Sequence, residues 1–121
     1  MSTCNIDKWN MLAPTFNAFE IPKIGEDDCL TLINDLKLIT KDSSVMDVGC
    51  GAGRYAIAFA QMCRNVIGTD LSPQMIDYAQ KRADSMGLSH ISFICEDWDA
   101  ISIQERNYQN QFDFVFAHMT P

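Results

Sequence analysis

From Val45 onward, short apolar runs alternate with longer segments whose apolar residues recur at helical spacing. The runs are rich in β-branched and aromatic residues, which predicts strands at Val45–Gly49, Asn65–Asp70, His90–Cys95 and Phe112–His118. The intervening segment Leu71–Gly87 has the periodicity of a helix, and Tyr55–Met62 is apolar almost all round, which predicts a well-buried helix. Strands that alternate with helices predict an α/β fold with a parallel sheet and right-handed crossovers. Because the runs are almost continuously apolar, we expect helices on both faces of the sheet.

The helix predicted at Leu71–Gly87 has the clearest local signals. Ser72 is a natural N-cap, Pro73 suits the first helical position, and Gly87 suits the position just past the end. Asp77 and Lys81 are spaced to pair on the exposed side. The predicted apolar stripe consists of Met75, Ile76, Ala79, Ala83 and Met86.

The part of the chain before Val45 has weaker signals for secondary structure. Its sequence predicts a short helix at Ile6–Ala13 that ends before Pro14, followed by irregular chain. From Glu26 the pattern turns helical, with an apolar face predicted to consist of Cys29, Leu32, Ile33 and Leu36. We therefore divide the chain into an N-terminal helix and irregular cap segment, residues 1–25, and an α/β domain, residues 26–121.

The charge and the composition narrow the classes of partner. The net charge is −7 and 47% of the residues are hydrophobic, which predicts a folded core without a basic surface. Because proteins that bind phosphate backbones need a basic face, we expect no nucleic-acid partner. The N-terminus lacks a signal peptide and no apolar run spans a membrane, so we expect a cytoplasmic protein without a membrane partner. The five cysteines form no C-x-x-C pair, and we expect no metal site.

The candidate chemistry centres on the glycines that follow the first predicted strand, in "VMDVGCGAGR". A glycine turn at the end of one strand and an acid, Asp70, at the end of the next are typical of a site for an adenosine-type cofactor. The spacing differs from the dinucleotide fingerprint, because Arg54 stands where its third glycine would be. Asp47, just before the turn, would repel a pyrophosphate but attract a ligand with an ammonium and a sulfonium group. These observations favour S-adenosylmethionine over NAD.

Four ordered segments, "VMDVGCGAGR", "VIGTDLSPQMIDYA", "ISFICEDWDA" and "FDFVFAHMTP", resemble the motifs of class I S-adenosylmethionine-dependent methyltransferases. The resemblance implies a Rossmann-like parallel sheet with helices on both faces. That family has seven strands in the order 3-2-1-4-5-7-6, so we expect a domain truncated after the fourth strand.

The resemblance also assigns roles to residues. The turn residues would wrap the methionine part of the cofactor, with Asp47 on the same side, and Asp70 would bind the ribose. The remaining matches would contact the adenine. Glu96 replaces the glycine that usually precedes the adenine-binding acid, which leaves a slip of one residue open there. The predicted cofactor-binding residues are Asp47, Gly49, Cys50, Gly51, Gly53, Asp70, Leu71, Met75, Asp97 and Trp98.

The sequence carries less information about the methyl acceptor. The loop after the fourth strand, "AHMTP", lacks the N/D-P-P-Y/F of nucleic-acid amino methyltransferases, and we expect a small-molecule acceptor. His118 is the candidate for a catalytic base. The exposed fourth strand predicts a homodimer, and we expect the chain alone to lack activity. The alternatives are a non-catalytic cofactor-binding or assembly module with the same fold and, with less support, an NAD-dependent oxidoreductase.

Overall fold

The computed structural model describes residues 3–17, 19–96 and 111–117. In chain order its elements are α1 (Thr3–Asn17), α2 (Asp28–Asp35), β1 (Ser44–Val48), α3 (Arg54–Ala60), β2 (Asn65–Asp70), α4 (Pro73–Ser85), β3 (Ile91–Cys95) and β4 (Phe114–Ala117). The predicted strands and the predicted helices after Val45 are therefore confirmed, with ends that shift by one or a few residues.

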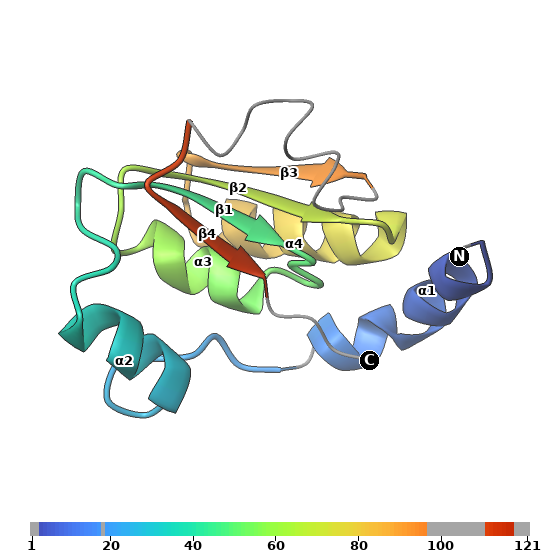
Figure 1. Ribbon diagram of the computed structural model, residues 1–121. Coiled ribbons are helices and arrows are strands. Elements are labelled where there is room, and N and C mark those ends of the chain that lie inside the picture. Colours follow the sequence, from blue (N-terminus) through green and yellow to red (C-terminus); the bar gives the residue numbers. More distant parts are fainter. Residues whose placement is uncertain (1–2, 18, 97–110, 118–121) are drawn as a thin grey trace.

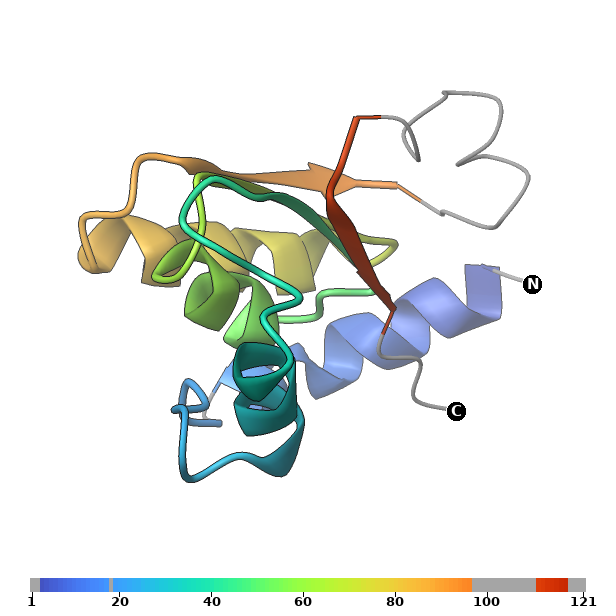
Figure 2. The same cartoon turned by 60° about the vertical axis from the view of Figure 1, so that its left-hand side comes forward.

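The strands form one parallel sheet in the order β3-β2-β1-β4 (Figure 1). Val45 on β1 pairs with Val66 on β2, and on its other side with Phe114 on β4. Both α3 and α4 lie on the same face of the sheet, as right-handed crossovers in one direction require (Figures 1 and 2). The connection between β3 and β4, residues 97–110, lies outside the described residues. The α/β, Rossmann-like parallel sheet expected from the sequence is confirmed. Helices were expected on both faces, and the two described crossover helices, α3 and α4, cover one of them.

The main core lies between this face of the sheet and α3. Every α3 residue from Tyr55 to Ala60 is buried, as the all-round apolar pattern predicts. The ring of Phe59 packs edge-on against Phe116, with centroids 5.1 Å apart, and Tyr55 stacks at a tilt on the same ring at 5.2 Å. Phe116 therefore joins the edge strand β4 to the helix layer.

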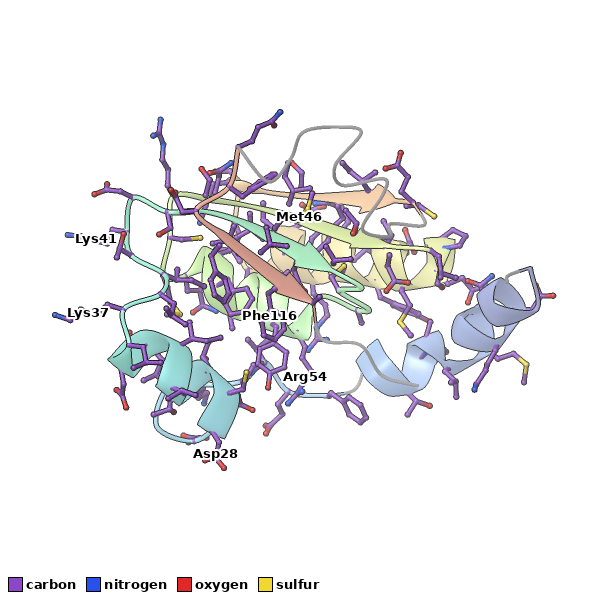
Figure 3. The ribbon with its side chains drawn as sticks, viewed as in Figure 1. Asp28, Lys37, Lys41, Met46, Arg54 and Phe116 are labelled. Atoms are coloured by element: carbon purple, nitrogen blue, oxygen red, sulfur yellow. The ribbon has the colours of Figure 1, made fainter. Side chains whose placement is uncertain are left out.

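Phe112 does not share the face of Phe114 and Phe116. The sequence pattern places the three rings on one side, but Phe112 precedes β4 and packs with Met46 and Val48. Figure 3 shows Met46 on the face of the sheet away from α3, whereas Phe116 points toward the helices. The period-two expectation fails here because Phe112 lies before the first residue of the strand.

The buried face of α2 also differs from the prediction. Asp27 caps the helix by accepting a hydrogen bond from the backbone N–H of Leu30 at 2.9 Å. Leu30 and Ile33 are buried in the main core, whereas Leu32 and Leu36 are 57% and 59% exposed. Of the predicted face, Ile33 is therefore buried as expected, whereas Leu30 takes the place of Leu32 and Leu36 in the core.

Helix α1 continues through Pro14 instead of ending before it. A proline inside a helix removes one backbone hydrogen bond, here the one to Asn10, but its fixed φ is helical. Packing compensates for this loss, because α1 lies against α4 and Ala13 is fully buried there. The boundary after residue 25 stays a prediction.

Helix α4 begins where its capping residues predict. Ser72 accepts from the backbone N–H of Met75, Pro73 is the first residue, and Lys81 pairs with Asp77 at 3.0 Å. Met86 is the exception, since it lies at the C-cap and is 45% exposed. No helix in the part of the chain that the structure describes is long and apolar enough to cross a membrane.

Candidate cofactor site

The glycine turn joins β1 to α3 and lies against the end of β2. The backbone N–H groups of Gly49 and Cys50 both donate to the carbonyl of Thr69, each at 2.8 Å. Gly49, Gly51 and Gly53 have φ values of +75°, +57° and +87°, which few side chains tolerate. The turn is therefore fixed by β2, and its fold requires glycine at these positions.

The three glycines differ in what surrounds them. Apart from its chain neighbours, no atom of the described residues lies within 4 Å of the place where a Cβ at Gly49 would stand, so this glycine borders open space. A Cβ at Gly51 would lie 3.9 Å from the sulfur of Met75. A Cβ at Gly53 would lie only 2.9 Å from the Cβ of Ala79. Gly49 thus leaves room for a ligand, whereas Gly53 permits close contact between α3 and α4.

Asp70 ends β2 and connects the glycine turn to α4. Its Oδ2 accepts from the backbone N–H of Gly51 at 2.9 Å, and its Oδ1 accepts from that of Ser72 at 2.9 Å. Burial raises the pKa of Asp70, while hydrogen bonds from the backbone of Ser72, Gly51 and Leu71 oppose this shift. A carboxylate offers about four lone-pair sites, so Asp70 keeps acceptor capacity beyond these backbone donors. Asp70 is half-buried and can accept hydrogen bonds from a ligand at this edge of the sheet.

Asp47 lies on β1, two residues before the first glycine of the turn. Its side chain is 1% exposed, and its Oδ1 is buried without a hydrogen-bond partner. Burial raises the pKa of Asp47 well above its usual range; Asp70 raises it further, and a hydrogen bond from the backbone of Ala56 lowers it. A buried acceptor without a partner is rare in folded proteins. The orphan oxygen therefore marks a place that a bound donor could fill.

The predicted site residues divide into an accessible group and a buried group. Gly49 is exposed, and Gly51, Asp70 and Leu71 are half-buried. The buried group consists of Asp47, Cys50, Gly53 and Met75. Asp97, Trp98 and His118 lie outside the described residues.

Two members of the buried group support the turn. Met75 is 1% exposed and packs with Ala13 and Ala52, which leaves almost none of its surface for an adenine ring. Cys50 contributes its backbone to the turn, and burial raises the pKa of its thiol well above the usual range. A thiol in that state is a weak nucleophile.

The nearest arginine in the sequence, Arg54, does not face the turn. Its Nε donates to the carbonyl of Glu20 at 3.1 Å, and its guanidinium lies over the rings of Phe19 and Tyr55. Among the described residues, the acidic side chains at the turn are thus those of Asp47 and Asp70. No group of three or more side chains suited to a metal ion occurs among residues 3–17, 19–96 and 111–117.

Three contributors to this region were not predicted as site residues. Gly68 on β2 is needed for space, because a Cβ there would lie 2.8 Å from the ring of Phe93 and 3.1 Å from the Cys50 sulfur. Ser72 was predicted as an N-cap only. Asn10 contacts Ser72 from α1, and no local signal in the sequence indicates that contact, since the two residues are 62 positions apart.

A glycine turn after β1, an acid at the end of β2 and a parallel sheet in this order define an α/β domain that binds an adenosine-type cofactor. The family model of the methyltransferase domain matches residues 45–121, and the chain belongs to this family. S-adenosylmethionine, the cofactor expected from the sequence, is confirmed for the domain.

Relatives and solved structures agree with this family. A 23S rRNA (uracil(1939)-C(5))-methyltransferase of Marinomonas posidonica is 35% identical over 57 residues, which are 47% of this chain and 13% of that protein. The human tRNA (uracil-5-)-methyltransferase homolog A is 31% identical over 77 residues, which are 64% of this chain and 12% of that protein. The chain thus spans about an eighth of these relatives.

A solved structure supports the fold. The methyltransferase from Thiobacillus denitrificans in complex with S-adenosylhomocysteine superposes with a TM-score of 0.56 and 22% identity, covering 72% of this chain and 36% of that one.

The exclusion of nucleic acid as a partner was wrong. The relatives named above are methyltransferases of rRNA and tRNA. The charge argument considered the net charge of these 121 residues alone, whereas the matched residues make up only 13% and 12% of these relatives. An acidic domain of this family is therefore compatible with an enzyme that acts on nucleic acid.

Proposed function

We infer that the protein binds S-adenosylmethionine at the carboxyl ends of β1 and β2 and uses it for methyl transfer. The observation that carries this inference is the pair of carboxylates at the glycine turn. Asp70 keeps acceptor capacity for the ribose, and the buried Oδ1 of Asp47 has no donor among the described residues. An ammonium group on the methionine side would supply one.

The local electrostatics favour this cofactor over a dinucleotide. The carboxylate of Asp70 disfavours a pyrophosphate at the turn, and Arg54 is turned away toward Glu20. The open space at Gly49 allows a ligand to approach the backbone closely. When bound, S-adenosylmethionine supplies an electrophilic methyl group with a good leaving group. The residues of this chain hold and orient it, which is the main protein contribution to such a displacement.

Isothermal titration calorimetry with S-adenosylhomocysteine and NAD tests the inference. We expect S-adenosylhomocysteine to bind more tightly than NAD. The Asp70→Asn variant should bind it at least about tenfold more weakly, because a charged acceptor of two hydrogen bonds is lost. Asp84→Asn, an exposed substitution on α4, is the matched control and should bind like the unchanged protein. Tighter binding of NAD would contradict the inference.

For the acceptor we infer RNA, with the names of the two relatives as support. An assay with methyl-labelled cofactor and total RNA, with and without ribonuclease, tests this class. Label in ribonuclease-sensitive material would identify RNA and would contradict the expectation that these residues alone are inactive. Label in other material would contradict RNA as the acceptor.

A further inference from the structure

Helix α1 reaches the candidate cofactor site through one polar contact. The hydroxyl of Ser72 donates to Oδ1 of Asn10 at 2.5 Å, and the backbone N–H of Gln74 lies 3.5 Å from the same oxygen. Ser72 is fully buried. The contact therefore joins α1 to the first turn of α4, next to the end of β2.

Ser72 connects Asn10 to Asp70 through hydrogen bonds. Its backbone N–H donates to Oδ1 of Asp70 at 2.9 Å, and its Oγ accepts from the backbone N–H of Met75 at 3.2 Å. A hydroxyl has a single proton. Because Asn10 takes that proton, the lone pairs of Ser72 stay directed at Met75. Asn10 thus helps to hold in place the N-cap residue whose backbone N–H donates to Asp70.

The position of Asn10 is itself supported by two contacts further along the chain. Ala13, one turn further along α1, is fully buried against Ala52 of the glycine turn and Met75. Past the end of α1, Nη2 of Arg82 donates to the carbonyl of Phe19 at 2.5 Å. Figures 1 and 2 both show α1 beside the carboxyl ends of the strands. Helix α1 therefore lies next to the candidate cofactor site.

We propose that Asn10 is a positioning residue of the cofactor site, which orients Ser72 and, through it, the carboxylate of Asp70 toward the ribose hydroxyls. The proposal rests on the function inferred above, in which Asp70 binds the ribose. It makes α1 part of the cofactor-binding unit. Asn10 itself does not have to touch the cofactor.

Three variants test the proposal by calorimetry with S-adenosylhomocysteine. Asn10→Ala removes the acceptor of Ser72 and should weaken binding about tenfold, the equivalent of one hydrogen bond. Asn10→Asp keeps an acceptor oxygen and should bind within about threefold of the unchanged protein. Met11→Ala changes the adjacent residue on α1, which is 82% exposed, and should leave binding unchanged.

A double-mutant cycle with Asp70→Asn separates positioning from a merely structural role. If Asn10 acts through Asp70, the effect of Asn10→Ala should shrink to less than about threefold in the Asp70→Asn background. An equal effect in both backgrounds would overturn the proposal, and so would normal binding by Asn10→Ala. Circular dichroism of each unliganded variant verifies that it is folded. If the unchanged protein does not bind S-adenosylhomocysteine, the inferred function fails instead, which is a different result.

Discussion

The third glycine of the turn, Gly53, lies so close to Ala79 of α4 that a Cβ at Gly53 would stand 2.9 Å from the Cβ of Ala79. Real Cβ contacts are longer than this, so a side chain at Gly53 would force α3 and α4 apart. The resemblance to methyltransferases predicts a role for Gly53 in wrapping the cofactor. Its surroundings show a role in packing that does not depend on a ligand.

Gly53→Ala should lower the free energy of unfolding by about 2–4 kcal/mol, because a strained φ and a steric clash add. Gly87→Ala is the matched control. Gly87 has a similar φ, +73° against +87°, but no atom lies within 4 Å of its Cβ position. This variant should lose only about 1 kcal/mol. Urea unfolding measures both, and equal losses would show that the contact with Ala79 is unimportant.

The Gly53→Ala/Ala79→Gly double variant isolates the clash. Removal of the Ala79 Cβ should recover part of the loss caused by Gly53→Ala, although glycine within α4 costs about 1 kcal/mol by itself. The two substitutions should therefore be non-additive. Strict additivity would mean that backbone strain alone accounts for the effect of Gly53→Ala.

Asp47 should make the stability of the unliganded protein fall as the pH rises. Burial and the nearby Asp70 raise the pKa of Asp47 in the folded state. A raised carboxyl pKa contributes stability that is full below the unfolded value, about 3.9, and is lost as the pH rises through the folded value. The loss is about 1.4 kcal/mol for each unit by which the two values differ.

Asp47→Asn has no such titration, so its free energy of unfolding should vary less between about pH 4 and about pH 8 than that of the unchanged protein. The comparison uses the slope of the free energy of unfolding against pH. A difference in stability that is the same at every pH does not affect this slope. The same variant should bind S-adenosylhomocysteine more weakly, because the attraction for its ammonium group is lost. Parallel slopes for the two proteins would contradict the assignment of a raised pKa to Asp47.

The sequence predicted those parts of the fold that local signals determine. The strands follow from their apolar runs, and α4 follows from Ser72, Pro73 and Gly87, which lie where cap chemistry places them. The sheet order follows from the handedness of the crossovers and from the family resemblance. For the site, the turn and Asp70 were predicted at the same edge, and a hydrogen bond of 2.9 Å joins Asp70 to Gly51.

The predictions failed where tertiary contacts, and not the local sequence, determine the structure. On α2 the sequence favours the stripe through Leu32 and Leu36, but packing in the main core buries Leu30 instead. Pro14 was expected to stop α1, but burial of Ala13 against α4 outweighs one lost hydrogen bond.

Arg82 should hold the end of α1 in place. Its Nη2 donates to the carbonyl of Phe19, while burial and the neighbouring Arg54 lower its pKa. Arg82→Ala should reduce the free energy of unfolding by about 1 kcal/mol, the usual value of one hydrogen bond. Hydrogen exchange should accelerate in α1 more than in β1 and β2.

Lys81→Ala is the control for Arg82→Ala on the same helix. Lys81 and Asp77 form an exposed pair, with 72% and 61% of their side chains accessible, and such a pair contributes little to stability. Exchange in α1 should therefore remain as in the unchanged protein. Equal acceleration in both variants, or none in Arg82→Ala, would contradict the role given to Arg82.

Tyr55 should connect the start of α2 to the start of α3 through its hydroxyl. That hydroxyl lies 2.9 and 2.8 Å from the two carboxylate oxygens of Asp27, which also caps α2. Burial, followed by the hydrogen bond and the charge of Asp27, raises the pKa of Tyr55 to about 12. Tyr55→Phe should therefore lower the free energy of unfolding by about 1.5–3 kcal/mol, as expected for a hydrogen bond to a charged group.

The stability that this contact contributes should depend on pH at high pH, where Tyr55 ionises. A tyrosine whose folded pKa is raised contributes stability that is full below its unfolded pKa, about 10, and is lost as the pH rises toward 12. Tyr78→Phe, on α4, serves as the control and should leave both stability and this pH dependence nearly unchanged. Ultraviolet absorbance should show one tyrosine fewer titrating near pH 12 in Tyr55→Phe. A Tyr55 that titrates near its unfolded value would show that the bond to Asp27 does not form.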